Sequence, residues 1–200
     1  MKRDDVFMSQ PPTGQPPTGR SPMGQPPIIS RVWVMRDYDK CTGCRLCELA
    51  CSLHHENKFW PESSRVRVFM LVPGVEMPHL CTQCSDYPCV NACPKKALSV
   101  DETTGAVKVN NEECIACGIC TNACPGKIPH LHPDRKRVVI CDLCDGKPEC
   151  AKTCTALGFN ALKTYPRMPS PLYDVYAETP EKITENLARK FYGDKAEELI

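Results

Sequence analysis

The spacing of the cysteines constrains this chain more than any other feature. The sequence contains 200 residues and 16 cysteines, and the cysteines fall into four tight groups of four. Disulfide scaffolds scatter their cysteines so that each bridge closes a loop, whereas C-x2-C units bind one metal centre. The grouping therefore predicts a metal protein and argues against a disulfide framework. In chain order the groups are Cys41, Cys44, Cys47 and Cys51; Cys81, Cys84, Cys89 and Cys93; Cys114, Cys117, Cys120 and Cys124; and Cys141, Cys144, Cys150 and Cys154.

The intervals within the groups indicate iron–sulfur clusters. The third group, which ends in Cys124-Pro125, fits the bacterial ferredoxin run C-x2-C-x2-C-x3-C-P in full. The second group widens the middle interval, the first lacks the proline, and the fourth has the longest interval and Thr155 in place of proline. Zinc sites use two C-x2-4-C pairs and need no further cysteines at these offsets. We therefore predict four [4Fe–4S] clusters, with zinc as an alternative that is strongest at the fourth group.

The same spacing predicts how the groups share clusters. In a two-cluster ferredoxin the last cysteine of each run ligates the other cluster of the pair. The second and third groups both end in Cys-Pro and are separated by a stretch that reads as a hairpin, so they form a self-contained core. The first and fourth groups flank this core, which favours a nested pairing over the tandem alternative of first with second and third with fourth. The nested ligand sets are Cys41, Cys44, Cys47 and Cys154 for cluster 1; Cys81, Cys84, Cys89 and Cys124 for cluster 2; Cys114, Cys117, Cys120 and Cys93 for cluster 3; and Cys141, Cys144, Cys150 and Cys51 for cluster 4.

The rest of the chain divides around this region. Residues 1–30 repeat Gln-Pro-Pro-Thr-Gly, a composition that cannot fold alone, so we expect a disordered tail or an arm that wraps a partner. Residues 31–165 form the four-cluster domain, with its core at 78–128. Residues 166–200 are expected to hold an extended segment and a C-terminal helix.

Local patterns predict short elements within a loop-rich α+β fold. We expect strands at 31–36, 64–69 and 137–140, a hairpin joining 98–100 to 106–109, and an extended wrap over 155–177.

The C-terminal helix has clear boundary signals. It should start with Thr179 as N-cap and Pro180 at the first helical position, and it should end at Gly193. Its apolar stripe of Ile183, Leu187 and Phe191 has two interpretations, core packing or docking on a partner.

Composition excludes several functions. The net charge is +1, which argues against a general nucleic-acid or anionic-membrane binder. No apolar run is long enough to span a membrane, and no secretory leader is recognisable, so we expect a cytoplasmic protein. Nucleophile–base pairs, phosphate loops and the G-x-G-x-x-G fingerprint are missing. We therefore predict no catalytic residue and no cofactor-binding residue beyond the cluster ligands.

We interpret His54, His55, His130 and His132 as polar loop residues, with hydrogen bonding near a cluster as the alternative.

Taken together, the motifs "CTGCRLCELACSLHHENKFWPESSRVRV", "HLCTQCSDYPCVNACPKKAL", "CIACGICTNACP" and "VVICDLCDGKPECAKTC" resemble a known family. They are similar to the four-cluster electron-transfer subunits of molybdenum and tungsten oxidoreductases. The dimethyl sulfoxide reductase type is the widest relative. The small subunits of tungsten aldehyde oxidoreductase and class II benzoyl-CoA reductase complexes look closer. The resemblance covers residues 31–165 and implies two fused bacterial ferredoxin-like modules and the nested pairing. It also implies a large catalytic partner that carries a tungsten or molybdenum pterin, and further redox subunits or a ferredoxin as additional partners.

These observations predict a non-catalytic electron-transfer subunit of an oxidoreductase complex. Four [4Fe–4S] clusters would relay single electrons to or from the active site of the partner. The alternative is a free-standing polyferredoxin that carries electrons by diffusion.

Overall fold

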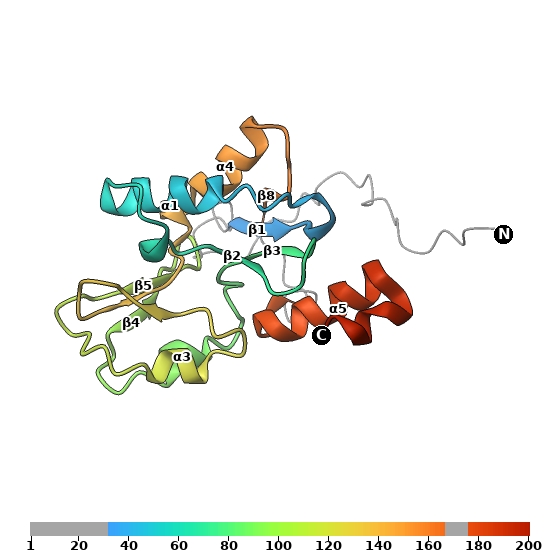
Figure 1. Ribbon diagram of the computed structural model, residues 1–200. Helices are drawn as coiled ribbons and strands as arrows, with labels where there is room; N and C mark the ends of the chain where they lie inside the picture. The colour runs from blue at the N-terminus through green and yellow to red at the C-terminus, as the bar shows by residue number, and fades with distance from the viewer. Residues whose placement is uncertain (1–31, 167–175) are drawn as a thin grey trace, which may run out of the picture.

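Short helices and two-stranded sheets alternate along the chain (Figure 1). The structure is a computed structural model, and it describes residues 32–166 and 176–200. The α-helices are α1 (Leu46–Glu56), α2 (Pro88–Asn91), α3 (Ile119–Ala123), α4 (Glu149–Ala156) and α5 (Pro180–Tyr192). The 3-10 turns are η1 (Tyr38–Lys40), η2 (Pro61–Ser63), η3 (Leu143–Gly146) and η5 (Gly193–Glu198). The strands are β1 (Val32–Arg36), β2 (Arg67–Met70), β3 (Glu76–His79), β4 (Leu98–Val100), β5 (Val107–Val109), β6 (His130–Leu131), β7 (Val138–Val139) and β8 (Leu162–Pro166).

The described strands pair into antiparallel ribbons, β1 with β8, β2 with β3, β4 with β5 and β6 with β7. The β4–β5 ribbon is the predicted hairpin between the second and third cysteine groups, and its register places Leu98 opposite Val109. The β1–β8 ribbon joins the two ends of the cysteine-bearing region, with Arg36 opposite Leu162. Sequence elements that flank the first and fourth groups therefore meet in space.

Helix lengths follow from the residue after the last cysteine of each group. Proline disfavours the helical conformation in the residue before it. Accordingly α2 and α3 end before Cys93-Pro94 and Cys124-Pro125. The first and fourth groups have Ser52 and Thr155 at the equivalent positions, and α1 and α4 continue past them. Helix α1 packs against α4, and helix α2 packs against α3.

Several expected boundaries were wrong. The strand expected at 64–69 begins later, as β2, and the one expected at 137–140 shortens to β7. The extended wrap expected over 155–177 is interrupted, because α4 continues to Ala156 before the chain turns into β8. Proline is absent after the fourth group, so no local signal ends that helix earlier. The predicted N-terminal tail and most of the extended segment, at 1–31 and 167–175, lie outside the described residues.

Helix α5 begins and ends as predicted. The Thr179 hydroxyl accepts a hydrogen bond from the Lys182 backbone N–H, and Gly193 follows the last helical residue with a positive φ. Figure 1 shows α5 beside β3, away from α1 and α4.

The apolar stripe of α5 is divided between two environments. Ile183 and Leu187 are buried in a small second core that contains Val75 and Met77. Phe191 is 41% exposed. Core packing therefore accounts for the first two positions of the stripe and not for the third.

None of the helices that the described residues form combines the length and hydropathy needed to cross a membrane.

Candidate metal centres

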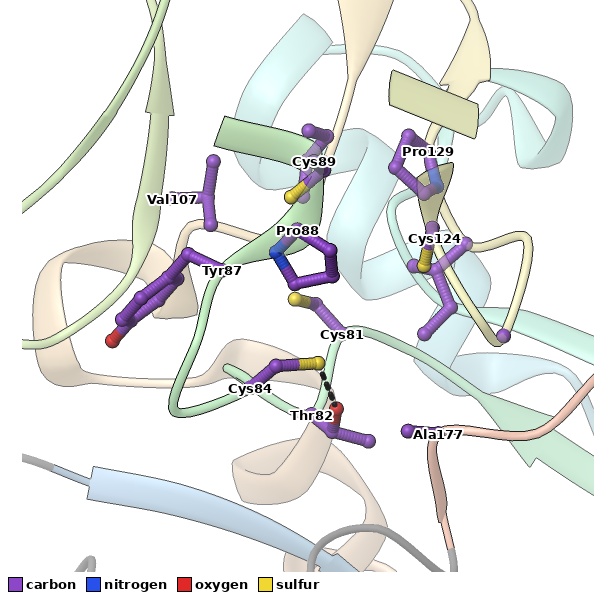
Figure 2. Close-up of a pocket in the computed structure, with 13 residues that line it drawn as sticks. Cys81, Thr82, Cys84, Tyr87, Pro88, Cys89, Val107, Cys124, Pro129 and Ala177 are labelled. Carbon is purple, nitrogen blue, oxygen red and sulfur yellow. Dashed lines mark hydrogen bonds between the residues drawn. The ribbon is translucent and has the colours of Figure 1, made fainter. Parts of the chain in front are cut away.

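A cavity between the second and third cysteine groups is lined by four cysteines. They are Cys81, Cys84 and Cys89 of the second group and Cys124 of the third. Figure 2 shows the four side chains around one space, with Pro88 and Val107 on its apolar wall. The Thr82 hydroxyl lies 3.3 Å from the Cys84 sulfur. The structure thus brings together the whole set predicted for cluster 2.

Two further cavities repeat this arrangement. One is lined by four cysteines of the second and third groups, Cys93, Cys114, Cys117 and Cys120. The other is lined by four cysteines of the first and fourth groups, Cys41, Cys44, Cys47 and Cys154. In each case three cysteines come from one group and the fourth is the last cysteine of another group, as the nested pairing requires. A tandem pairing would have placed Cys93 with the first group instead.

The thiols of the fourth predicted set lie close enough to affect one another electrostatically, although no cavity described above is lined by all four. Burial, followed by the neighbouring thiols of Cys51, Cys47 and Cys144, raises the pKa of Cys150. Burial and then Cys150 do the same for the pKa of Cys141. Cys51 stands on α1 and Cys150 on α4, so the contact between these helices holds the set in place.

Each C-x-x-C loop makes the same backbone turn. The residue before the second cysteine has a positive φ in all four groups, with values between 50° and 66° at Gly43, Gln83, Ala116 and Leu143. Only one of these residues is glycine, the residue that adopts this conformation without strain. Left-handed steps of this kind turn successive N–H groups toward one concave side, where they bind anions. The loops are therefore shaped to surround a negatively charged group.

Backbone N–H groups also reach the cysteine sulfurs directly. Three of the four last cysteines accept such a bond at 3.3–3.4 Å. The donor and acceptor pairs are Arg65 to Cys51, Ala97 to Cys93, and Leu162 to Cys154. Hydrogen bonds to sulfur stabilise the thiolate form and are one of the means by which a protein sets the potential of a cluster.

The oxidation state and the pKa values of the thiols bear on whether the sets can hold a metal. All sixteen cysteines lie in the described residues, and none forms a disulfide. Burial raises the pKa of both Cys81 and Cys89 to about 12. Buried thiols such as these two resist ionisation, and a metal reverses this because it deprotonates coordinating thiols. The donor set fits a thiolate-ligated metal centre.

The four sets form a series. Electrostatic interactions between thiols connect neighbouring sets at Cys120 with Cys89, Cys81 with Cys141, and Cys150 with Cys47. These interactions indicate the order third set, second set, fourth set, first set. The outer sets each contain an exposed cysteine, Cys117 in the third and Cys44 in the first. The series runs from one accessible end to another.

His55 was interpreted as a polar loop residue, and the structure corrects this. It lies in α1, and its Nε2 is 3.0 Å from the Asp142 carboxylate in the fourth group. Its Nδ1 is 2.8 Å from the Cys51 carbonyl and 3.7 Å from the Cys51 sulfur. Although burial opposes it, the hydrogen bond with Asp142 raises the pKa of His55. The alternative of hydrogen bonding beside a predicted cluster ligand, here Cys51, is the better description.

His132 was also interpreted as a polar loop residue, but its side chain is not exposed to solvent. It is buried, with its Nε2 3.6 Å from a Glu56 carboxylate oxygen. Arg135 and Arg137 pair with the same carboxylate at 3.0 and 2.9 Å. The last residue of α1 thereby anchors the β6–β7 ribbon that follows the third group. Sequence reasoning missed this contact, because nothing local connects residues so far apart.

Comparisons with known proteins agree with this chemistry. Residues 73–163 match the family described as "4Fe-4S dicluster domain", and residues 38–54 match "4Fe-4S binding domain". The chain is 54% identical to the polyferredoxin-like subunit of aliphatic sulfonate oxidoreductase from Pyrococcus furiosus, over 82% of this chain and 95% of that subunit. It is 34% identical to the electron transport protein HydN of Escherichia coli, over 61% of this chain and 82% of HydN.

Among solved structures, the chain is similar to one in the active site complex BamBC of benzoyl coenzyme A reductase. The identity is 24%, the alignment covers 84% of this chain and 94% of that one, and the TM-score is 0.40.

Proposed function

Because the chain belongs to the family of ferredoxin-like iron–sulfur subunits of oxidoreductases, we propose that its four cysteine sets each hold one [4Fe–4S] cluster. The observation that carries the proposal is the lining of the three cavities, each by four cysteines and each with the composition that nested pairing requires. Such clusters, when bound, each exchange one electron. In this reading residues 32–166 are two fused ferredoxin-like modules, one nested inside the other.

The order of the sets supports a relay between two surfaces. The outer sets approach the surface at Cys117 and Cys44, and the second and fourth sets lie between them. We propose that Cys117 and Cys44 mark the two faces through which electrons enter and leave. The protein supplies the ligands, the N–H groups directed at sulfur and the apolar walls, all of which set potentials.

The partner is proposed from the resemblance and from the relatives. We propose a large catalytic subunit that carries a tungsten or molybdenum pterin, with further redox subunits or a ferredoxin as the other electron partner. The printed name of the Pyrococcus furiosus relative makes an aliphatic sulfonate the first substrate class to test on that subunit. The proposed location is the cytoplasm, and the proposed role of this chain is non-catalytic.

A free-standing polyferredoxin is the second candidate. The observation that favours it is the relative HydN, whose printed name is simply "Electron transport protein" and mentions no oxidoreductase complex. The two candidates differ in solution, since a subunit should be isolated with its partner.

The test is an anoxic purification of the native protein through a tag on this chain, followed by analysis for Fe, W, Mo and Zn. Co-purification of a larger subunit with tungsten or molybdenum is expected, and electron transfer from an aliphatic sulfonate to a viologen dye would identify the substrate class. Iron in a single-chain preparation without either metal would favour the carrier. Zinc in place of iron would overturn both candidates.

A further inference from the structure

The guanidinium of Arg36 is buried inside the protein. Arg36 is the last residue of β1, and 2% of its surface is exposed. Its Nη2 donates hydrogen bonds to the backbone carbonyls of Leu80 and, at 3.1 Å, of Cys81. Arginine remains protonated in proteins, so this is a buried positive charge.

No carboxylate of the described residues pairs with this charge. Burying an ion away from water is costly unless an opposite charge or hydrogen bonds compensate it. Two other arginines near the cysteine sets have acidic partners, Arg137 with Glu56 at 2.9 Å and Arg65 with Asp142 at 4.0 Å. Arg36 has only two neutral carbonyls, and its Nε and Nη1 have no hydrogen-bond partner among the described residues.

Aromatic side chains separate Arg36 from solvent. The Tyr176 ring lies 5.0 Å from the guanidinium carbon, and the Tyr176 hydroxyl donates a hydrogen bond of 3.2 Å to the Arg36 carbonyl. Trp33 and Tyr38 pack against Tyr176, with ring centroids 5.4 and 5.9 Å away. Water therefore screens this charge poorly, which makes its effect on nearby groups large.

The neighbouring groups that would become anionic are cluster ligands. Arg36 touches the backbone of Cys81, in the second set, and β1 also contacts η3, which contains Cys144 of the fourth set. The cysteines that interact electrostatically with Arg36 are Cys81 and Cys141. Cys81 and Cys141 also interact with each other. Arg36 therefore lies where the second set, from the inner pair of groups, meets the fourth set, from the outer pair.

We propose that Arg36 is a positioning residue whose fixed positive charge compensates clusters 2 and 4 together and raises their reduction potentials relative to the two outer clusters. The inference rests on the proposed function. Reduction adds a negative charge to a cluster, and an unscreened cation nearby favours the reduced form. The charge of Arg36 would thus favour electrons on clusters 2 and 4. Because these clusters belong to different modules, it would also favour electron transfer from one module to the other.

The test is a redox titration of the holoprotein, followed by electron paramagnetic resonance, for the wild type, Arg36→Gln and Arg36→Lys. In Arg36→Gln we expect two of the four potentials to fall, changing the reduced-to-oxidised ratio at a fixed solution potential by about tenfold. For a one-electron couple this corresponds to about 59 mV. Arg36→Lys, which keeps the charge but not the planar fork, should titrate close to the wild type. Arg189→Gln removes the same charge at an exposed residue of α5 that pairs with Glu185 and Glu197, and it should change nothing.

The other outcomes are equally decisive. Four unchanged potentials in Arg36→Gln would overturn the inference, as would an equal shift in the glutamine and lysine variants. Should Arg36→Gln lose iron, a loss limited to two clusters and rescued by Arg36→Lys would support the role of the charge, whereas loss of all four in both variants would refute it. A wild-type protein without four [4Fe–4S] clusters would instead contradict the proposed function itself.

Discussion

At the scale of residues, the grouping of the cysteines could be predicted from the sequence because the information is local, and three of the four predicted sets each line one cavity. A C-x-x-C loop brings its cysteines together within a few residues, and the x3 interval directs the last cysteine elsewhere. The residues that sequence reasoning missed act across long distances in the chain. His55 meets Asp142, and Arg36 meets Cys81, through contacts that no spacing rule encodes.

The nested pairing is testable with double variants. Cys47 and Cys154 line the same cavity, so Cys47→Ser, Cys154→Ser and the double variant should each lose one cluster, about 4 iron atoms per chain. Tandem pairing puts these cysteines in different clusters, and the double variant would then lose about 8. Iron analysis after anoxic purification distinguishes the two.

A matched control uses Cys47 and Cys51, which are in the same group but in different proposed sets. Their double variant should lose about 8 iron atoms, twice the loss of either single variant. Equal losses in both double variants would contradict the nested assignment.

At the scale of elements, the hairpin, β1 and α5 were predictable because their signals lie within their own residues. Thr179 and Gly193 fix the ends of α5, and alternating residues mark the β4–β5 hairpin. Strands β3, β6 and β8 were not predicted as strands, since each forms by pairing with another strand. The partner of β8 is β1, at the opposite end of the cysteine region.

Proline placement determines the length of α1, and Ser52→Pro tests this. Proline within a helix removes a hydrogen bond and forces the preceding residue out of the helical region, at a cost of about 3 kcal/mol or more. We expect lost helicity in far-ultraviolet circular dichroism and a lower midpoint of thermal unfolding. The last turn, with His55 and Glu56, should detach from the fourth group and from the β6–β7 ribbon.

Ser52→Ala is the matched control for this change. It keeps the helix but removes the hydroxyl that bonds to the Leu49 carbonyl and accepts from the Trp60 N–H. Its cost should be about 1 kcal/mol. A proline variant as stable as the alanine variant would show that α1 does not depend on its last turn.

At the scale of the whole molecule, thiols replace much of an ordinary apolar core. The main core combines aliphatic residues such as Val34, Val66 and Leu80 with buried cysteines of all four groups. When a fold relies on metal ligation in this way, the free energy of metal binding is also free energy of folding.

Removal of iron should therefore unfold the cysteine-bearing region. We expect an iron chelator, applied with an oxidant, to abolish most of the secondary structure of residues 32–166, as measured by circular dichroism and by increased proteolysis. An apoprotein that stays folded and protease-resistant would mean that the apolar core suffices without clusters.

The most direct test of the account is the number and type of clusters in the full chain. Mössbauer spectroscopy with iron and sulfide analysis should find about 16 iron atoms and about 16 sulfides per chain, all in [4Fe–4S] clusters. About 12 iron atoms, or zinc at one or more sites, would contradict the claim that every cysteine set holds a [4Fe–4S] cluster.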